Sequence, residues 1–321
     1  MKKKAAYLLL AGLSLLIALI AWQGVNVLDE LDNAGWKLLW LVPAFLPIMA
    51  LGTTALRTLF APHARPSFAA VYHANWIGLA VNWFLPVAQI GGEFVKARVL
   101  GGGAMRYDRA MGGIVVDKTI QALTQAVYAL IGLAFFAYAA TGDDVIVGAL
   151  AFLVFLSLGI YGFYRVQQAG MFAFLARIAD KLIGGRFNVG LSGGASKIDV
   201  AIREIYKDRN RFLRSCLWRM AFRLSLAGEI WLALYLFGHP VGFMEAVILE
   251  SLTNVVVSIA FAIPGALGVQ EGGFMLLSAA LGLGAEVGLA VSLARRSRDI
   301  LIGIPALIAW QIDEGRRAGK E

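Results

Sequence analysis

Long apolar runs without charge constrain this chain more than any other feature of its sequence. The run Ala5–Trp22 contains eighteen residues and no charged side chain, which is long enough for a helix to cross a bilayer. Of the 321 residues, 59% are hydrophobic and 16% are charged, whereas soluble domains have about 25% charged residues. A soluble fold of this length needs a mostly polar skin and cannot bury so much apolar surface. We therefore predict an all-α polytopic membrane protein, with residues 1–321 in a single transmembrane domain.

Basic residues are distributed unevenly along the chain. Three lysines precede the first apolar run, and twelve Lys and Arg residues accompany four acidic residues between Arg165 and Arg223. Because Lys and Arg are concentrated in cytoplasmic loops, both places are predicted to be cytoplasmic. The basic segment 165–211 is expected to include an in-plane surface helix at Met171–Ile183. A basic C-terminal tail then places both termini in the cytoplasm, with the chain in a bacterial inner membrane. The net charge of +8 has the same explanation, so nucleic-acid binding is not expected.

Two segments that lie 178 residues apart resemble each other. Each begins with a proline and reaches a glutamate seven residues later, and glycines lie between the two. The shared positions are Pro86, Gly91, Gly92 and Glu93 in the first segment and Pro264, Gly265, Gly268 and Glu271 in the second. Proline and glycine interrupt helices, so each segment predicts the tip of a re-entrant helical hairpin.

Six full spans plus these two hairpins would form an inverted repeat, with a first half at 5–140 and a second at 145–312. A simple count of eight spans is the alternative. On the inverted interpretation, the apolar stretch Gly273–Ala294 returns the second hairpin to the outer side, and Ile300–Gln311 is a separate short helix. The three arginines between them would then lie on the outer side, against the positive-inside tendency, unless they line an aqueous cavity.

Polar side chains within the predicted spans are the candidates for a substrate cavity. An ionisable group in a span costs about 2.5–3.5 kcal/mol on insertion scales, so such groups usually face a cavity or a partner. Glu93 and Glu271 either cap the backbone N–H groups of half-helices or face a polar lipid or proton path. Arg219 and Arg223 either join the cavity or extend to the cytoplasmic interface. The predicted cavity residues are Glu93, Lys96, Arg98, Asp117, Lys118, Glu229, Gln270, Glu271, Arg298 and Asp299.

Signals for catalysis are weak. The three histidines lack a metal-binding spacing, and the single cysteine, Cys216, excludes an intrachain disulfide and a cysteine-based metal cluster. The glycines at 101–103 are not followed by the Lys-Ser/Thr of a phosphate-binding loop. We therefore expect no enzyme activity, no cofactor and no metal. Any driving force would be an ion gradient, or the transport would be passive.

The segments Pro86–Leu100, Asp117-Lys118 and above all Pro264–Phe274 resemble the flippase-like transmembrane region of bacterial lysylphosphatidylglycerol synthases. The second segment is most similar to a branch of that family associated with hopanoid biosynthesis. The resemblance implies a transporter that moves a polar or isoprenoid-type membrane lipid between leaflets. The chain ends soon after the last predicted helix, so the transferase activity of the synthases is not expected. The alternatives are a membrane-embedded lipid-modifying enzyme and a non-catalytic partner of lipid-synthesis enzymes.

Overall fold

A computed structural model describes Asp32 and residues 34–85, 91–103, 105–139, 191–259 and 263–318. These residues form nine α-helices and three short 3-10 helices, and no strand occurs among them. The all-α prediction is therefore confirmed for the described residues. Several predicted features lie outside them: the span Ala5–Trp22, the surface helix Met171–Ile183 and the hairpin residue Pro86.

The helices differ widely in length. Two regions, Gly35–Thr58 and Tyr107–Tyr138, are long and apolar enough to cross a membrane. The α-helices in chain order are α2 (Leu41–Thr58), α3 (Phe68–Phe84), α4 (Gly91–Gly101), α5 (Tyr107–Ala139), α8 (Leu191–Lys207), α9 (Arg209–Leu236), α10 (Phe243–Ile259), α11 (Val269–Ala280) and α12 (Ala285–Ala318). The 3-10 helices are η1 (Gly35–Trp40), η2 (Pro62–Ala64) and η3 (Pro264–Ala266).

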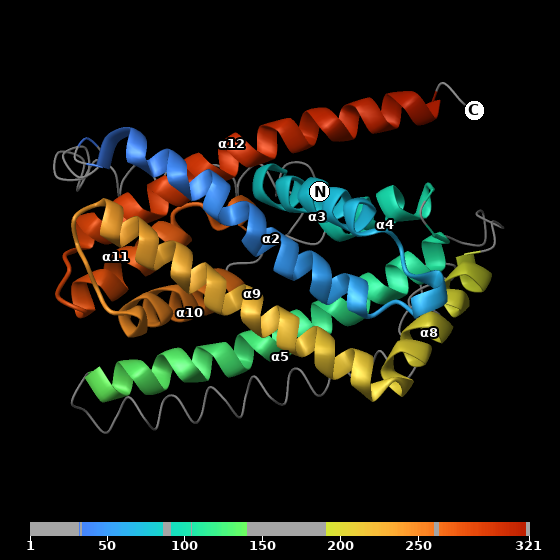
Figure 1. The fold of residues 1–321 in the computed structure, drawn as a ribbon, viewed down its shortest axis with the longest axis horizontal. Helices are drawn as coiled ribbons and strands as arrows, with labels where there is room; N and C mark the ends of the chain where they lie inside the picture. The colour runs from blue at the N-terminus through green and yellow to red at the C-terminus, as the bar shows by residue number, and fades with distance from the viewer. Residues whose placement is uncertain are drawn as a thin grey trace, which may run out of the picture.

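Equivalent helices in two parts of the chain make equivalent packing contacts. Helices α2 to α5 recur in order as α9 to α12, and the starts of α5 and α12 are 178 residues apart. Helix α3 packs on α4 as α10 packs on α11, while α5 packs on α10 and α12 packs on α3. Helices α2 and α9 pack on each other at the centre, and α5 and α12 lie along opposite long edges (Figure 1). This exchange of equivalent contacts is the pattern expected of two related repeats.

The pairs α3–α4 and α10–α11 occupy opposite ends of the molecule and meet where each is interrupted. The α3–α4 pair lies toward the end that carries α8 and the C-terminus, and α10–α11 lies toward the other end (Figure 1). At the meeting point, a Cβ on Gly265 would lie 2.9 Å from the Trp83 carbonyl oxygen. The backbone at Gly265 and Gly268 has φ of 59° and 78°, a region that favours glycine. Close approach and backbone conformation therefore both require glycine at Gly265.

One predicted boundary is wrong. Helix α11 ends at Ala280, and α12 then continues from Ala285 to Ala318, past the arginines and Pro305. The predicted continuous apolar stretch at Gly273–Ala294, with a separate short helix after it, is thus incorrect. The break lies earlier because Gly282 and Gly284 adopt φ of 75° and 93°. The arginines do not end the helix, since each has a carboxylate partner in the fold.

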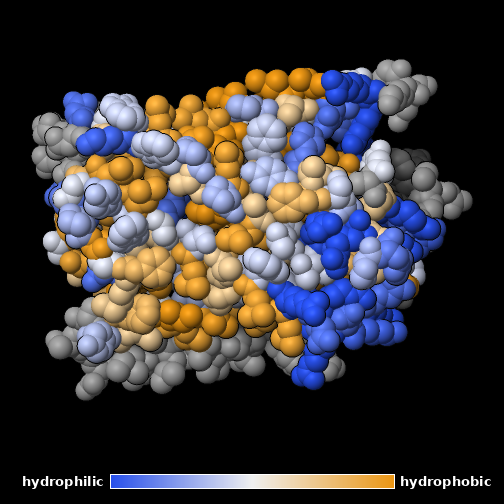
Figure 2. Space-filling view, viewed as in Figure 1, coloured by the Kyte–Doolittle hydropathy of each residue, from blue (hydrophilic) through white to orange (hydrophobic). Residues whose placement is uncertain are grey.

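The surface is divided by polarity along the long axis. Hydrophilic side chains gather at the end formed by α8 and the C-terminal part of α12, whereas hydrophobic side chains cover much of the middle (Figure 2). Large apolar residues such as Leu217, Leu276 and Ile304 are exposed on α9, α11 and α12. An apolar surface of this extent is typical of a face that contacts lipid.

Candidate functional site

Glu93 lies near the start of α4 with two lysines around it. Its carboxylate is 3.0 Å from Lys96 Nζ and 2.8 Å from Lys118 Nζ. Helix α4 is capped by another side chain, because the Gly92 N–H donates to Asn82 Oδ1 at 2.9 Å. Glu93 therefore acts as the partner of two cations. The backbone N–H groups before Gly91, which Glu93 would cap in the alternative interpretation, lie outside the described residues.

Two glycines allow α3 and α4 to come close enough to bury Lys96. A Cβ on Gly92 would lie 2.1 Å from the Gly78 carbonyl oxygen. A Cβ on Gly78 would lie 2.5 Å from side-chain carbons of Lys96. Small residues permit such close helix packing in membranes. The buried position of Lys96 thus depends on glycine in both helices.

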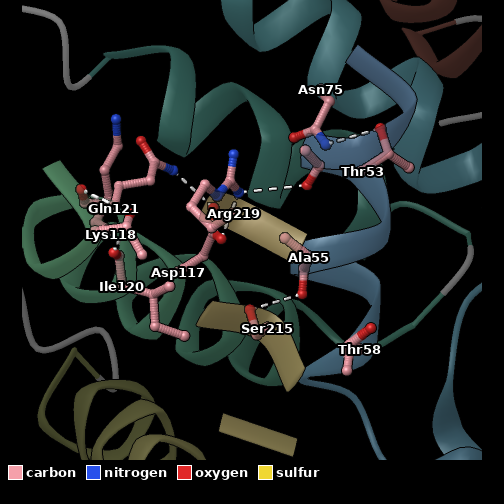
Figure 3. A network of polar contacts seen from close by, with 12 residues as sticks. Thr53, Ala55, Thr58, Asn75, Asp117, Lys118, Ile120, Gln121, Ser215 and Arg219 are labelled. Carbon is pink, nitrogen blue, oxygen red and sulfur yellow. Dashed lines mark hydrogen bonds and ion pairs between the residues drawn. The ribbon is translucent and has the colours of Figure 1, made fainter. Parts of the chain in front are cut away.

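Asp117 and Arg219 form a buried ion pair between α5 and α9. Arg219 Nη2 is 2.5 Å from Asp117 Oδ1, and Gln121 donates to the other carboxylate oxygen at 2.7 Å. Arg219 also donates to the Gly52 carbonyl of α2, so it lies between two helices (Figure 3). The alternative in which Arg219 extends to the interface is therefore wrong. We call Glu93, Lys96, Asp117, Lys118 and Arg219 the first cluster.

Arg223 lies one turn after Arg219 and is held by neutral groups. Its N–H groups donate to Gln125 Oε1, to Thr124 Oγ1 at 3.2 Å and to the Gln121 carbonyl at 2.6 Å. Among the described residues, no carboxylate forms an ion pair with Arg223. The first cluster has three basic and two acidic groups, so Arg223 adds to an existing surplus of positive charge.

A second cluster centres on α12 and contains Glu229, Glu250, Glu271, Arg295, Arg296, Arg298 and Asp299. Arg295 pairs with Glu250 at 2.6 Å and Arg296 pairs with Glu271 at 2.7 Å. Arg298 lies 3.2 Å from Glu229 and 3.1 Å from Asp299. These arginines begin about 15 Å into α12 at ~1.5 Å per residue. They are buried partners of carboxylates, which explains their conflict with the positive-inside tendency of loops.

Glu271 has two roles in the second cluster. Its carboxylate accepts the Gly268 N–H at 2.7 Å, which caps α11, and also binds Arg296. The Glu271–Arg296 pair corresponds to Glu93–Lys118, because each partner is displaced by 178 residues. Gln270 lies next to the pair and donates to Ser292 Oγ at 3.0 Å.

Most predicted cavity residues belong to the two clusters, with one clear departure. Arg98 lies at the exposed end of α4, where it binds Glu314 through bonds of 2.8 and 2.9 Å. These bonds hold the pKa of the Glu314 carboxyl below its ordinary value. The sequence analysis missed Arg295 and Arg296, although the 178-residue offset from Lys118 points to Arg296. Among the described residues, no group of His, Cys, Asp and Glu is placed to hold a metal ion.

The comparisons with known proteins agree with this architecture. A sequence model described as the lysylphosphatidylglycerol synthase TM region matches residues 8–306. The chain belongs to this family. A UPF0104 membrane protein from Pyrococcus horikoshii is 24% identical over 328 residues, which cover 95% of each chain. No solved structure matches the chain. Membership of the lysylphosphatidylglycerol synthase TM family confirms the resemblance drawn from the motifs and the prediction of a membrane protein.

Proposed function

We propose that this protein transports a membrane lipid with an anionic head group between the two leaflets. The observation that carries the proposal is the surplus of basic side chains in the first cluster and at Arg223. Buried charge without a counter-charge is costly, so a phosphate or similar group is a fitting occupant. Lys118 is the cation that a head group would reach first, because 36% of its side chain is exposed compared with 7% for Lys96.

The two helix pairs suggest how the lipid would pass. We place α3–α4 and α10–α11 in the membrane as re-entrant hairpins from opposite faces, in addition to six full spans. Such inverted repeats support alternating access when one repeat moves against the other. The corresponding pairs Glu93–Lys118 and Glu271–Arg296 would then open in turn. In this arrangement the end with α8 and the C-terminus faces the cytoplasm, and the membrane is a bacterial inner membrane.

Liposomes of phosphatidylcholine and phosphatidylglycerol with a trace of fluorescent phosphatidylglycerol test the proposal. The purified protein should make inner-leaflet label accessible to the impermeant quencher dithionite. Lys118→Gln should slow this movement by about tenfold or more, since a charged hydrogen bond contributes roughly 1.5–3 kcal/mol. Glu93 keeps Lys96 as a partner, so the variant should remain folded.

Lys207→Gln is the matched control, because Lys207 is an exposed lysine at the end of α8. It should transport like the unaltered protein. Equal rates for Lys118→Gln and Lys207→Gln would contradict the assigned head-group site. Mass spectrometry of the recovered lipid distinguishes the rival function, since a changed lipid mass would support a membrane-embedded enzyme. If the folded protein neither moves the labelled lipid nor changes its mass, the result would support the other alternative, a non-catalytic partner of lipid-synthesis enzymes.

A further inference from the structure

The second cluster has one carboxyl group more than it has cations. Glu250 and Glu271 each have an arginine of their own, at 2.6 and 2.7 Å. Arg298 forms ion pairs with both Glu229 and Asp299, at 3.2 and 3.1 Å. Two carboxylates that share one guanidinium leave an uncompensated negative charge in a buried place.

Glu229 is the less well satisfied of the two acids. Its side chain is 0% exposed, compared with 11% for Asp299. Both of its oxygens are buried and form no hydrogen bond with the part of the chain that the structure describes. Arg298 is turned toward an aromatic ring, with its guanidinium carbon 3.9 Å from the Phe45 centroid. An ionised carboxylate in such a site is costly, whereas a neutral carboxyl group costs much less.

The other charges around Glu229 do not remove this surplus. Helix α12 contributes Arg295, Arg298 and Asp299, and α10 contributes Glu250. Arg295 is paired with Glu250, so among the described residues the shared Arg298 is the only cation that remains for Glu229. Helix α2 presents the uncharged Phe45, and the ion pair that α5 forms with α9 joins Asp117 to Arg219.

We propose that the carboxyl group of Glu229 is a proton-binding site. It holds one proton while Arg298 is paired with Asp299, and it ionises when Arg298 turns to it. The proton then passes to the Asp299 carboxylate, which is the more exposed acid, and from there to water. Given the proposed lipid transport, on which this coupling rests, the proton is the ion that drives it.

Infrared spectroscopy of the full chain in phosphatidylcholine nanodiscs tests the site without any lipid movement. At neutral pH, the spectrum should contain the C=O stretch of a protonated carboxylic acid, which shifts in D2O. Subtracting the Glu229→Gln spectrum should isolate this band. Subtracting the Glu314→Gln spectrum should not isolate any such band, because Glu314 is a surface acid paired with Arg98. Glu229→Met gives the same comparison if the amide variant fails to fold.

The outcomes separate the acids. Loss of the band in Asp299→Asn with retention in Glu229→Gln would overturn the assignment to Glu229. Absence of the band from the unaltered protein would overturn the proton site itself. Loss of the band only in the Glu229 variants would support the proton site at Glu229.

A second measurement separates the proton site from the proposed function. In the liposome assay, a pH gradient should change the rate of lipid movement by the unaltered protein but not by Glu229→Gln. The Glu229 band without lipid movement would keep the proton site and reject lipid transport. Lipid movement with neither band nor gradient dependence would reject the proton site and keep transport.

Discussion

At the scale of single residues, the Asp117–Arg219 pair shows how strongly buried charges depend on each other. Asp117 is 1% exposed, and its nearest cation is Arg219 at 2.5 Å. Arg219→Gln would leave this buried carboxylate without its ion-pair partner. We expect the variant to lose about 3–5 kcal/mol of stability, as is usual when one partner of a buried pair is removed. Unfolding in detergent micelles, followed by circular dichroism, measures the loss.

The double variant Asp117→Asn/Arg219→Gln should recover much of that stability, because neither charge remains. The exposed Arg98–Glu314 pair is the control, since 63% of the Arg98 side chain is exposed. Arg98→Gln should cost no more than about 1 kcal/mol. Equal losses for Arg98→Gln and Arg219→Gln would show that the pair at Asp117 is not buried.

At the scale of elements, the contact between α3 and α4 depends on Gly92. An added Cβ would lie 2.1 Å from the backbone carbonyl of Gly78, so the two helices would have to separate. We expect Gly92→Ala to lower the free energy of unfolding by about 1–3 kcal/mol, the usual cost of overpacking. Gly272→Ala in α11 is the matched control, because no atom lies within 4 Å of its added Cβ. A melting temperature for Gly92→Ala as high as that of Gly272→Ala would contradict the close approach.

At the scale of the whole molecule, the inverted arrangement predicts opposite sides for the open ends of α3–α4 and α10–α11. In a Cys216→Ser background, we expect Gly103→Cys to react with an impermeant maleimide only from the cytoplasm. Ala280→Cys should react only from outside. Both positions are exposed. Lys207→Cys on α8 is the control and should react from the same side as Gly103→Cys. Reaction of Gly103→Cys and Ala280→Cys from one side would reject the inversion.

The sequence alone determined the class of the protein and the places where its helices are interrupted. Apolar runs and scarce charge require helices in a membrane, because lipid cannot satisfy unpaired backbone groups. The shared Pro, Gly and Glu positions located η3 and the start of α4. The 178-residue offset also relates Lys118 to Arg296, whereas the hopanoid-associated branch stays a prediction.

Only the tertiary structure decided which charges meet. Asp117 and Arg219 are 102 residues apart, and Glu229 and Arg298 belong to different helices. A local pattern can predict that a charge within a span needs a partner, but it cannot say which helix provides it. The same gap caused the error at α12, where three arginines resembled the end of a helix. Their carboxylates come from α9, α10 and α11, so the helix continues because of packing that no local segment contains.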